Sequence, residues 1–335
     1  MSVRIGMICR SDSVGLGTLS WEFARHLKPH KVLMIHNDLH LSHPYRFDGL
    51  DVRDGNKMSP MDLEWFLKDI DVFFTIETPY NWNIIKECRK RGIKTVLYTM
   101  FEMTNDPIQL GFDLYICPSK LDMKYFPAEN SVFLPPPVAT DRLLWTRRER
   151  ANHFTHIGSH GGVGLRKGTP LLLEAMKYVK TDIKLTIFTW KPFFRSDDPR
   201  VIIEVVNFKN YWQAYREGDC MIYMQGANGI CLPIIEAMAS GMAVITTDLY
   251  PFNEYMPKEL LVKPDKFVKR RFGLRLIEVD DPILDPKKVA EKIDEIAGQS
   301  IVKFSKYGKV WAEKNSWEVL LPKYQKVFED LCKKQ

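Results

Sequence analysis

The sequence has few cysteines, and none of them stands in a metal-binding or redox spacing. Its 335 residues include six cysteines, which lie far apart, mostly among apolar neighbours, without a CxxC pair. A disulfide-rich secreted scaffold and a cysteine-based metal site are therefore not indicated. We expect reduced, buried thiols, as in a cytoplasmic protein.

Long apolar runs are also missing. No uninterrupted apolar stretch reaches the length needed to cross a bilayer, and "MSVRIGMICRSDS" lacks the basic start and long apolar stretch of a signal peptide. We expect a cytoplasmic protein, either soluble or peripheral at the inner membrane surface. GxSxG is absent too, so no Ser-His-Asp arrangement is indicated.

Charge of both signs is plentiful, with a formal net charge of +6 and a pI near 8.8. This balance favours anionic partners such as nucleotides, phospholipid head groups or nucleic acid, although the signal is weak when used alone. The length and the hydrophobic content of 45% allow a large core and favour two domains.

Short β-rich runs alternate with helical patterns along both halves of the chain. The first half contains "VRIGMIC", "KVLMIHN", "VFFTIET", "KTVLYTMF" and "DLYICPS"; the second contains "FTHIGS", "KLTIFTW", "VIIEVVNF", "DCMIYMQ" and "AVITTD". Such alternation predicts an α/β protein with doubly wound parallel sheets. The Pro-rich and basic segment between the halves predicts a domain boundary near residues 138–146.

In the first half, a glycine-containing loop follows the first predicted strand. Gly15, Gly17 and Thr18 would let the backbone approach an anion or a sugar at a helix N-terminus. A dinucleotide fingerprint is an alternative, supported by Asp38, but Ser20 replaces its third glycine. A simple turn between strand and helix has equal weight.

In the second half, "GSHGGVGLRKGTP" places Arg166 and Lys167 directly before a predicted helix with Thr169 as its N-cap and Pro170 in its first turn. Backbone amides, two cations and a helix dipole together suit a diphosphate. A solvated basic loop is the competing interpretation, and the place after a strand disfavours it.

Glu236 is the one charge in the run from Cys231 to Ile245. It lies about one turn into a helix that begins near Pro233 and ends near Gly241. Its two acceptor oxygens match a vicinal diol such as that of ribose. The alternative is a glutamate satisfied by the helix dipole and water, and the apolar surroundings favour the ligand.

The segments "NGICLPIIEAMASGMAVITTD", "RKGTPLLLEAM", "PPPVATDRLLW" and "NSWEVLLPKY" resemble the retaining glycosyltransferases of family 4 over nearly the whole chain. The resemblance implies the GT-B fold, with two facing Rossmann-like domains and a C-terminal helix crossing back. It divides the chain into an acceptor-side domain (1–142), a nucleotide-sugar donor domain (143–300) and helices returning to the first domain (301–335).

The resemblance also assigns roles by position. Glu236 matches the second glutamate of the family's E-x(7)-E pattern, which is implied to hold the donor ribose. Lys167 matches a diphosphate-binding lysine, and we suppose that Arg166 replaces the arginine ahead of it. Gly15 and Gly17 match the loop that contacts donor phosphate and sugar, and we add Thr18 to this donor-binding set.

Two departures from the pattern concern the chemistry. Asn228 stands where the first glutamate is implied to bind the sugar hydroxyls, so a negative charge is lost there. We keep Asn228 as a catalytic and donor-binding candidate, together with the helix N-terminus at Gly229 and Ile230. The histidine implied after a first-domain strand is missing; Glu102 is our catalytic candidate in that neighbourhood, with Glu77 as an alternative, although a structural role is the commoner one for either glutamate.

We expect no essential metal. The "DID" at 69–71 precedes its strand rather than following it, and His36, His40 and His43 lack a metal-ligand spacing. The basic patches "KECRKRG" and "KFVKRRFGLR" are interpreted as solvated surface. As a hypothesis, the first patch docks on an anionic membrane through its cations and the apolar residues beside them, Trp82, Ile84 and Ile85.

The favoured function is a metal-independent, retaining hexosyltransferase without a bound cofactor. It takes a UDP- or GDP-linked sugar as its donor and transfers it, in the interdomain cleft, to a lipid, glycan, protein or small-molecule acceptor; we expect no nucleic-acid partner. A catalytically silent nucleotide-sugar-binding module, motivated by Asn228, is the alternative from another class. An NAD-dependent Rossmann oxidoreductase is the third reading, and it leaves the second-half motifs unexplained.

Overall fold

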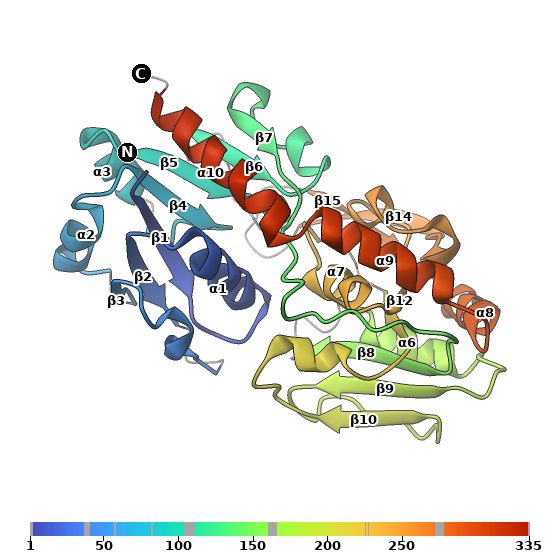
Figure 1. Cartoon of the computed structure of the whole chain (residues 1–335). Helices are drawn as coiled ribbons and strands as arrows, with labels where there is room; N and C mark the ends of the chain where they lie inside the picture. The colour runs from blue at the N-terminus through green and yellow to red at the C-terminus, as the bar shows by residue number, and fades with distance from the viewer. Residues whose placement is uncertain are drawn as a thin grey trace. The chain divides into compact units, whose positions relative to one another are not determined.

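The computed structural model describes residues 3–36, 41–56, 58–81, 83–103, 111–159, 166–224, 226, 228–271 and 278–333. The described chain forms two α/β units (Figure 1). The first unit holds the described residues up to Pro137 and those from Trp317 onward, and the second holds Val138–Arg271 and Glu278–Ser316. The α/β class predicted from the alternating pattern is confirmed.

The first unit contains a seven-stranded parallel sheet of order β3-β2-β1-β4-β5-β6-β7. Its central strands are apolar on both faces because helices cover a parallel sheet from both sides; every residue of β4 is buried. The strands are β1 (Ile5–Arg10), β2 (Lys31–Ile35), β3 (Val52–Asp54), β4 (Val72–Ile76), β5 (Lys94–Tyr98), β6 (Leu114–Cys117) and β7 (Ser131–Phe133).

The helices of the first unit include one from the far end of the chain. They are α1 (Gly15–Leu27), α2 (Pro60–Leu67), α3 (Asn83–Lys90) and α10 (Trp317–Lys333). The ring of Phe23 on α1 meets the rings of Trp317 and Tyr324 edge to face, at centroid distances of 5.0 and 5.3 Å. These aromatic contacts fix the C-terminal helix on the first unit, as the fold prediction requires.

The second unit contains a six-stranded parallel sheet of order β10-β9-β8-β11-β12-β13. The strand order reverses between β8 and β11, and loops at the carboxyl ends of strands flanking such a reversal are where doubly wound sheets bind ligands. The strands are β8 (His153–Ser159), β9 (Lys184–Thr189), β10 (Val201–Val205), β11 (Cys220–Tyr223), β12 (Ala243–Thr247) and β13 (Leu261–Val262).

Four helices of the second unit matter for the site and its support: α6 (Thr169–Met176), α7 (Leu232–Ala239), α8 (Pro286–Ile296) and α9 (Val302–Lys314). Of the two helices in segment 301–335, α9 belongs to the second unit and α10 to the first. The N-cap prediction for α6 is wrong by one residue. Gly168 holds that position with a φ of +78°, and Thr169 is already helical, because a left-handed backbone there favours glycine.

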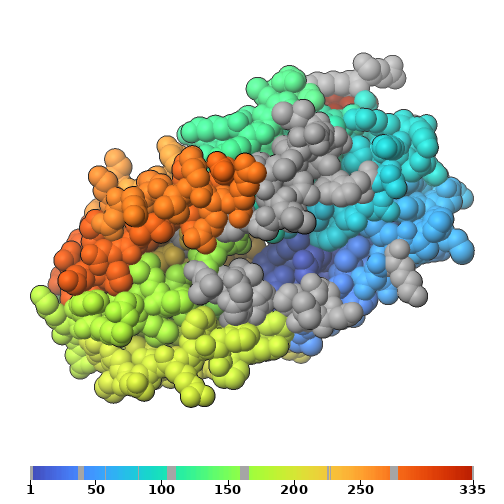
Figure 2. Space-filling view, turned by 180° about the vertical axis from the view of Figure 1, so that it is seen from behind, coloured from blue at the N-terminus to red at the C-terminus, as the bar shows by residue number. Residues whose placement is uncertain are grey.

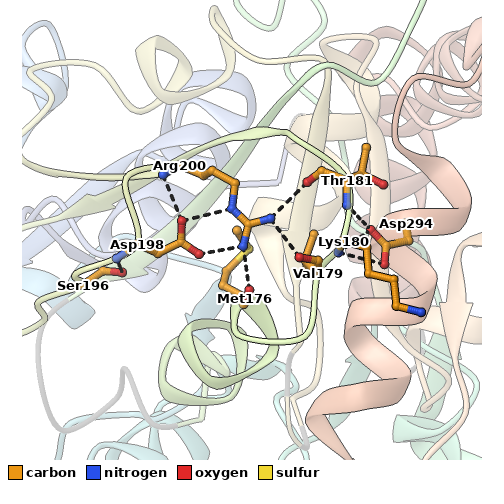
Figure 3. A network of polar contacts seen from close by, with 8 residues as sticks. All are labelled: Met176, Val179, Lys180, Thr181, Ser196, Asp198, Arg200 and Asp294. Atoms are coloured by element: carbon orange, nitrogen blue, oxygen red, sulfur yellow. Dashed lines mark hydrogen bonds and ion pairs between the residues drawn. The ribbon is translucent and has the colours of Figure 1, made fainter.

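A polar network anchors the C-terminal end of α6 (Figure 3). The Arg200 guanidinium donates to the carbonyl oxygens of Met176, Val179 and Thr181 at 2.8–3.0 Å, and it pairs with Asp198 at 2.7 Å. Asp294 on α8 accepts from the backbone N–H of Thr181 at 2.9 Å. The last carbonyl of α6 and two carbonyls of the segment after it are thereby satisfied, which anchors this end of the helix.

A two-stranded antiparallel hairpin is inserted between β13 and α8. It consists of β14 (Lys266–Arg270) and β15 (Val279–Ile283), and it includes much of the second basic patch. Two cations of this patch are paired across the hairpin: Lys269 with Asp280 at 2.8 Å, and Arg270 with Asp281 at 2.9 Å. The second basic patch, interpreted from the sequence as solvated surface, thus includes a strand of a hairpin with cross-strand ion pairs.

Candidate functional site

The candidate site lies in the loops at the carboxyl ends of β8 and β11, where the second sheet reverses its order. Arg166 and Lys167 occupy the turn before α6. Asn228 lies in the segment between β11 and α7, and Glu236 lies on α7 itself. The structure thus gathers four of the predicted donor-binding side chains at one edge of one sheet.

Lys167 is partly buried at this edge. Its Nζ lies 5.9 Å from the ring centroid of Tyr223, the last residue of β11. Burial lowers the pKa of Lys167 to about 8, and the neighbouring Arg166 acts in the same direction. The charge of Glu236 acts in the opposite direction, although no ion pair joins Lys167 to a carboxylate of the described residues. A cation desolvated in this way gains from a bound anion.

Two glycines let the loops that carry these side chains approach each other. A Cβ at Gly168 would lie 2.3 Å from the carbonyl oxygen of Met224, just past β11. The N–H of Gly226 donates to the carbonyl oxygen of Arg166 at 2.9 Å. The cation-bearing turn is therefore bound directly to the loop that leads toward Asn228, and Gly168 is required by packing.

A buried histidine on β8 contacts the first residue of α6. His156 Nδ1 lies 2.8 Å from the carbonyl oxygen of Ile222, and Nε2 lies 2.7 Å from the hydroxyl of Thr169. Because a carbonyl oxygen only accepts, Nδ1 carries the proton, and Nε2 accepts from the hydroxyl. Burial lowers the pKa of His156 to about 4, so the ring is neutral at physiological pH. Sequence reasoning did not single out this residue.

Glu236 is 8% exposed, and its carboxylate has a partner that no sequence pattern indicates. The hydroxyl of Tyr215 donates to Glu236 Oε2 at 2.5 Å. Tyr215 is buried and comes from the 3-10 helix η4 (Tyr211–Tyr215), 21 residues earlier in the chain. This bond fixes one carboxylate oxygen and so orients the group as a whole.

Asn228 is engaged with the backbone that follows it. Its Oδ1 accepts from the N–H groups of Ile230 at 3.1 Å and Cys231 at 2.8 Å. Cys231 precedes the first residue of α7 and has a left-handed φ of +54°. The amide oxygen therefore serves as a cap at the start of α7, with Gly229 enclosed between these residues.

In the first unit, Gly15, Gly17 and Thr18 form the first turn of α1. A Cβ at Gly17 would lie 2.0 Å from the backbone oxygen of Asp12, so only glycine fits there. The carboxylate of Asp12 accepts from Arg10 Nε at 2.6 Å and from the N–H of Val14 at 3.2 Å. The polar groups beside this turn are thus joined to one another.

Glu102, the catalytic candidate of the first unit, is 2% exposed and lies in the turn after β5. It stands near Asp122, which accepts from the hydroxyls of Thr99 and Ser119. Burial raises the pKa of Asp122, and Glu102 acts in the same direction. The alternative candidate Glu77 is only partly buried and has a left-handed φ of +66° at the end of β4.

No metal-binding arrangement is found among the described residues, in that no three of their His, Cys, Asp or Glu side chains are grouped to hold an ion. Asp71 of the "DID" segment pairs with Arg4 at 2.8 Å. His36 lies 2.6 Å from the Asn56 side-chain nitrogen, and His43 is buried. Asp38 and His40 lie outside the described residues, as does the glycine-rich stretch 160–165.

None of the described helices is long and apolar enough to cross a membrane. The proposed membrane-docking helix α3 buries Ile84 and Ile85 in the first unit, so these two side chains are not offered to a bilayer. Trp82 lies outside the described residues. Peripheral membrane contact through this helix remains a prediction that rests on its cations alone.

Comparison with known proteins finds a family match within the second unit. Residues 152–272, which include Arg166, Lys167, Asn228 and Glu236, match the family model described as glycosyl transferases group 1. No match was found among curated protein sequences. Over these residues the second unit is therefore similar to a group 1 glycosyl transferase domain.

Solved structures similar to the whole chain include a glycosyltransferase from Rickettsia africae, with a TM-score of 0.72, 14% identity and 100% of both chains covered. HepE of Anabaena in complex with UDP and glucose gives 0.70 and 10%, with 98% of this chain and 100% of that chain covered. The lipopolysaccharide outer core galactosyltransferase WaaB gives 0.64 and 13%, with 98% and 99% covered. The chain has the fold of these proteins, GT-B, as predicted.

Proposed function

We propose that the chain is a retaining glycosyltransferase that transfers a hexose from a UDP- or GDP-linked donor to an acceptor without a metal. The observation that carries this proposal is the meeting of Arg166, Lys167 and Glu236 at one sheet edge. Two cations suit a diphosphate, and a buried carboxylate suits the ribose diol. The family-model match and the UDP held by HepE of Anabaena support the same ligand class.

In this proposal the second unit stabilises the leaving group. When the bond between the sugar C1 and the diphosphate oxygen breaks, negative charge grows on the diphosphate. Arg166 and Lys167 stabilise that charge, and the burial that lowers the pKa of Lys167 makes an anion beside it favourable. The new bond forms between C1 and the oxygen of an acceptor hydroxyl, and the proton of that hydroxyl passes to the leaving diphosphate. We assign no covalent nucleophile, and Glu102 remains the proposed acceptor-side carboxylate.

Nucleotide binding tests the proposal directly. Calorimetric titration of the wild-type chain with UDP, GDP, ADP and NAD, in the presence of EDTA, is expected to show binding of UDP or GDP. Glu236→Ala is expected to weaken that binding about tenfold or more. Glu174→Ala, which changes a half-exposed glutamate on α6 paired with Lys177, is the matched control and leaves affinity unchanged. Binding of NAD alone, or of none of these, would sink the proposal.

The silent binding module is a second candidate because Asn228, at the first motif position, uses its amide oxygen to cap α7. The two candidates differ in turnover. Incubation with UDP-glucose, UDP-galactose and GDP-mannose in EDTA is expected to release UDP or GDP for an enzyme, even when water is the acceptor. Tight binding without any release would favour the module. The anomeric configuration of the released sugar, read by NMR at early times, tests retention.

A further inference from the structure

The first position of the glutamate pair carries no carboxylate in this chain, and its acceptor oxygen is already used. Asn228 Oδ1 accepts from Ile230 and Cys231, which leaves the Nδ2 group as the polar end of the side chain. An amide nitrogen donates hydrogen bonds but does not accept them. In the proposed function, the side chain of Asn228 therefore offers no acceptor to the hydroxyl groups of the donor sugar.

The β14–β15 hairpin brings a carboxylate to this loop. A Cβ at Gly226 would lie 2.7 Å from Asp281 Oδ1 and 3.6 Å from Arg166 Cγ. Asp281 therefore lies against the backbone two residues before Asn228 and beside the cation-bearing turn. Since any larger residue at position 226 would meet the carboxylate, the glycine leaves the space that Asp281 occupies.

Asp281 differs from its neighbour on the same strand. The side chain of Asp281 is 12% exposed, whereas that of Asp280 is 55% exposed and pairs with Lys269, which is also exposed. Adjacent residues of a strand face opposite sides, so the hairpin turns one acid toward solvent and the other toward Gly226. In the space-filling view, the residues coloured orange, which include the described part of the β14–β15 hairpin, lie on the molecular surface (Figure 2).

The base of the hairpin is fixed to the second unit. The Asp265 N–H donates to the carbonyl oxygen of Ile283 at 2.8 Å, and the Asp285 N–H donates to Asp265 Oδ2 at 2.7 Å. Asp285 in turn caps α8 by accepting from the N–H of Lys287. These hydrogen bonds hold the base of the hairpin, so the position of Asp281 on β15 is determined by the fold.

We propose that Asp281 binds hydroxyl groups of the donor sugar and supplies the carboxylate that Asn228 lacks. Oδ2 is held by Arg270 at 2.9 Å, and Oδ1 lies on the Gly226 side. A carboxylate with two acceptor oxygens receives hydrogen bonds from one or two sugar hydroxyls, and such charge-assisted bonds are the strong ones. The proposal rests on the proposed function and names the residue that reads the sugar.

The test compares binding of the nucleotide with binding of the sugar nucleotide. Titrations with UDP, UDP-glucose, UDP-galactose, GDP and GDP-mannose give the affinity gain contributed by each sugar. In the wild type we expect a gain of about tenfold or more for one donor. Asp281→Asn is expected to abolish this gain while leaving the affinity for UDP or GDP unchanged, because the loop and the cations remain in place.

Two variants separate sugar binding from hairpin stability. Asp280→Asn removes the exposed acid of the same strand and is expected to keep the sugar gain. Arg270→Gln removes the other partner of the ion pair with Asp281. We expect this variant to keep at least half of the affinity gain from the sugar, measured on a logarithmic scale. The inference is overturned if Asp281→Asn keeps the gain, if Arg270→Gln loses as much as Asp281→Asn, or if the wild type shows no gain from any sugar. Absence of UDP and GDP binding in the wild type would instead refute the proposed function.

Discussion

In the first unit the glycine turn between β1 and α1 packs against its own backbone, whereas in the second unit the turn between β8 and α6 carries two cations. Gly17 and Gly168 are both required by close contacts, with Asp12 and Met224 respectively. Beside Gly17, the carboxylate of Asp12 is matched by Arg10. Beside Gly168, Lys167 is desolvated without an ion-pair partner among the described residues.

This difference shows what a glycine loop after a strand does and does not indicate. The backbone needs the glycine in both units for the same steric reason, so the glycine alone does not identify a ligand site. A buried charge without an ion-pair partner is the stronger signal, because burying it has a cost that a bound ion offsets.

The largest expected effect tests whether packing requires the glycine in the first unit. Gly17→Ala places a Cβ 2.0 Å from the backbone oxygen of Asp12, so the backbone itself must shift. We expect a loss of about 3 kcal/mol or more in unfolding free energy, measured by urea denaturation. Gly15→Ala, at the exposed first residue of α1, is the control and should change stability by less than about 1 kcal/mol. Equal effects of the two substitutions would contradict the packing role of Gly17.

Acid should weaken the second unit through His156. Its pKa is about 4 in the fold against an ordinary value of 6.5, so the unfolded chain binds more protons in this range. Stability contributed by the neutral ring is complete above pH 6.5 and falls by about 3 kcal/mol as the pH drops to 4. We expect His156→Gln to be less stable than the wild type at pH 7 and to lose less stability between pH 7 and 4. Parallel pH profiles of the two proteins would refute this.

A smaller effect concerns the opposite end of α6. Arg200→Ala removes a guanidinium that donates to three carbonyl oxygens and pairs with Asp198. We expect a loss of about 2 kcal/mol in unfolding free energy, since the carbonyls are only partly buried. Arg195→Ala changes an exposed arginine nearby and should stay within about 0.5 kcal/mol. The network would be unimportant for stability if the two variants behaved alike.

The smallest expected effect tests whether the charge of Lys167 in the second unit contributes to nucleotide binding. Because the pKa of Lys167 is lowered to about 8, the lysine loses its charge as the pH rises through that value. The affinity for UDP or GDP should therefore fall about tenfold between pH 7 and pH 9. Titrations at both pH values check this. Lys167→Met should bind more weakly at pH 7 and show a flat profile; a wild-type profile that is equally flat would contradict the role of Lys167.

The central strands were predictable because their apolar runs are buried on both faces of parallel sheets, as β4 shows, whereas the short strands β3, β7 and β13 were not predicted. The hairpin of β14 and β15 was not, because its alternating charges are typical of solvated surface and only the cross-strand acids explain them. The N-cap of α6 was misplaced because Thr169 bonds to His156, a partner from β8, while Gly168 supplies the left-handed turn.

The candidate site was predictable where charge interrupts an apolar pattern, as at Glu236, and where cations precede a helix, as at Lys167. Its supports were not predictable. Tyr215 and Asp281 reach the site from η4 and from β15, and no spacing in the sequence links either residue to its partner. Such contacts depend on how the elements pack, which a linear pattern does not contain.

Amide hydrogen exchange with and without saturating UDP or GDP tests the central claim most directly, because it reads both glycine loops in one experiment. We expect slower exchange in peptides covering residues 166–176 and 228–239 when the nucleotide is bound. Unchanged exchange in both of these segments, or protection confined to residues 12–27 of the first unit, would contradict the placement of the nucleotide site in the second unit.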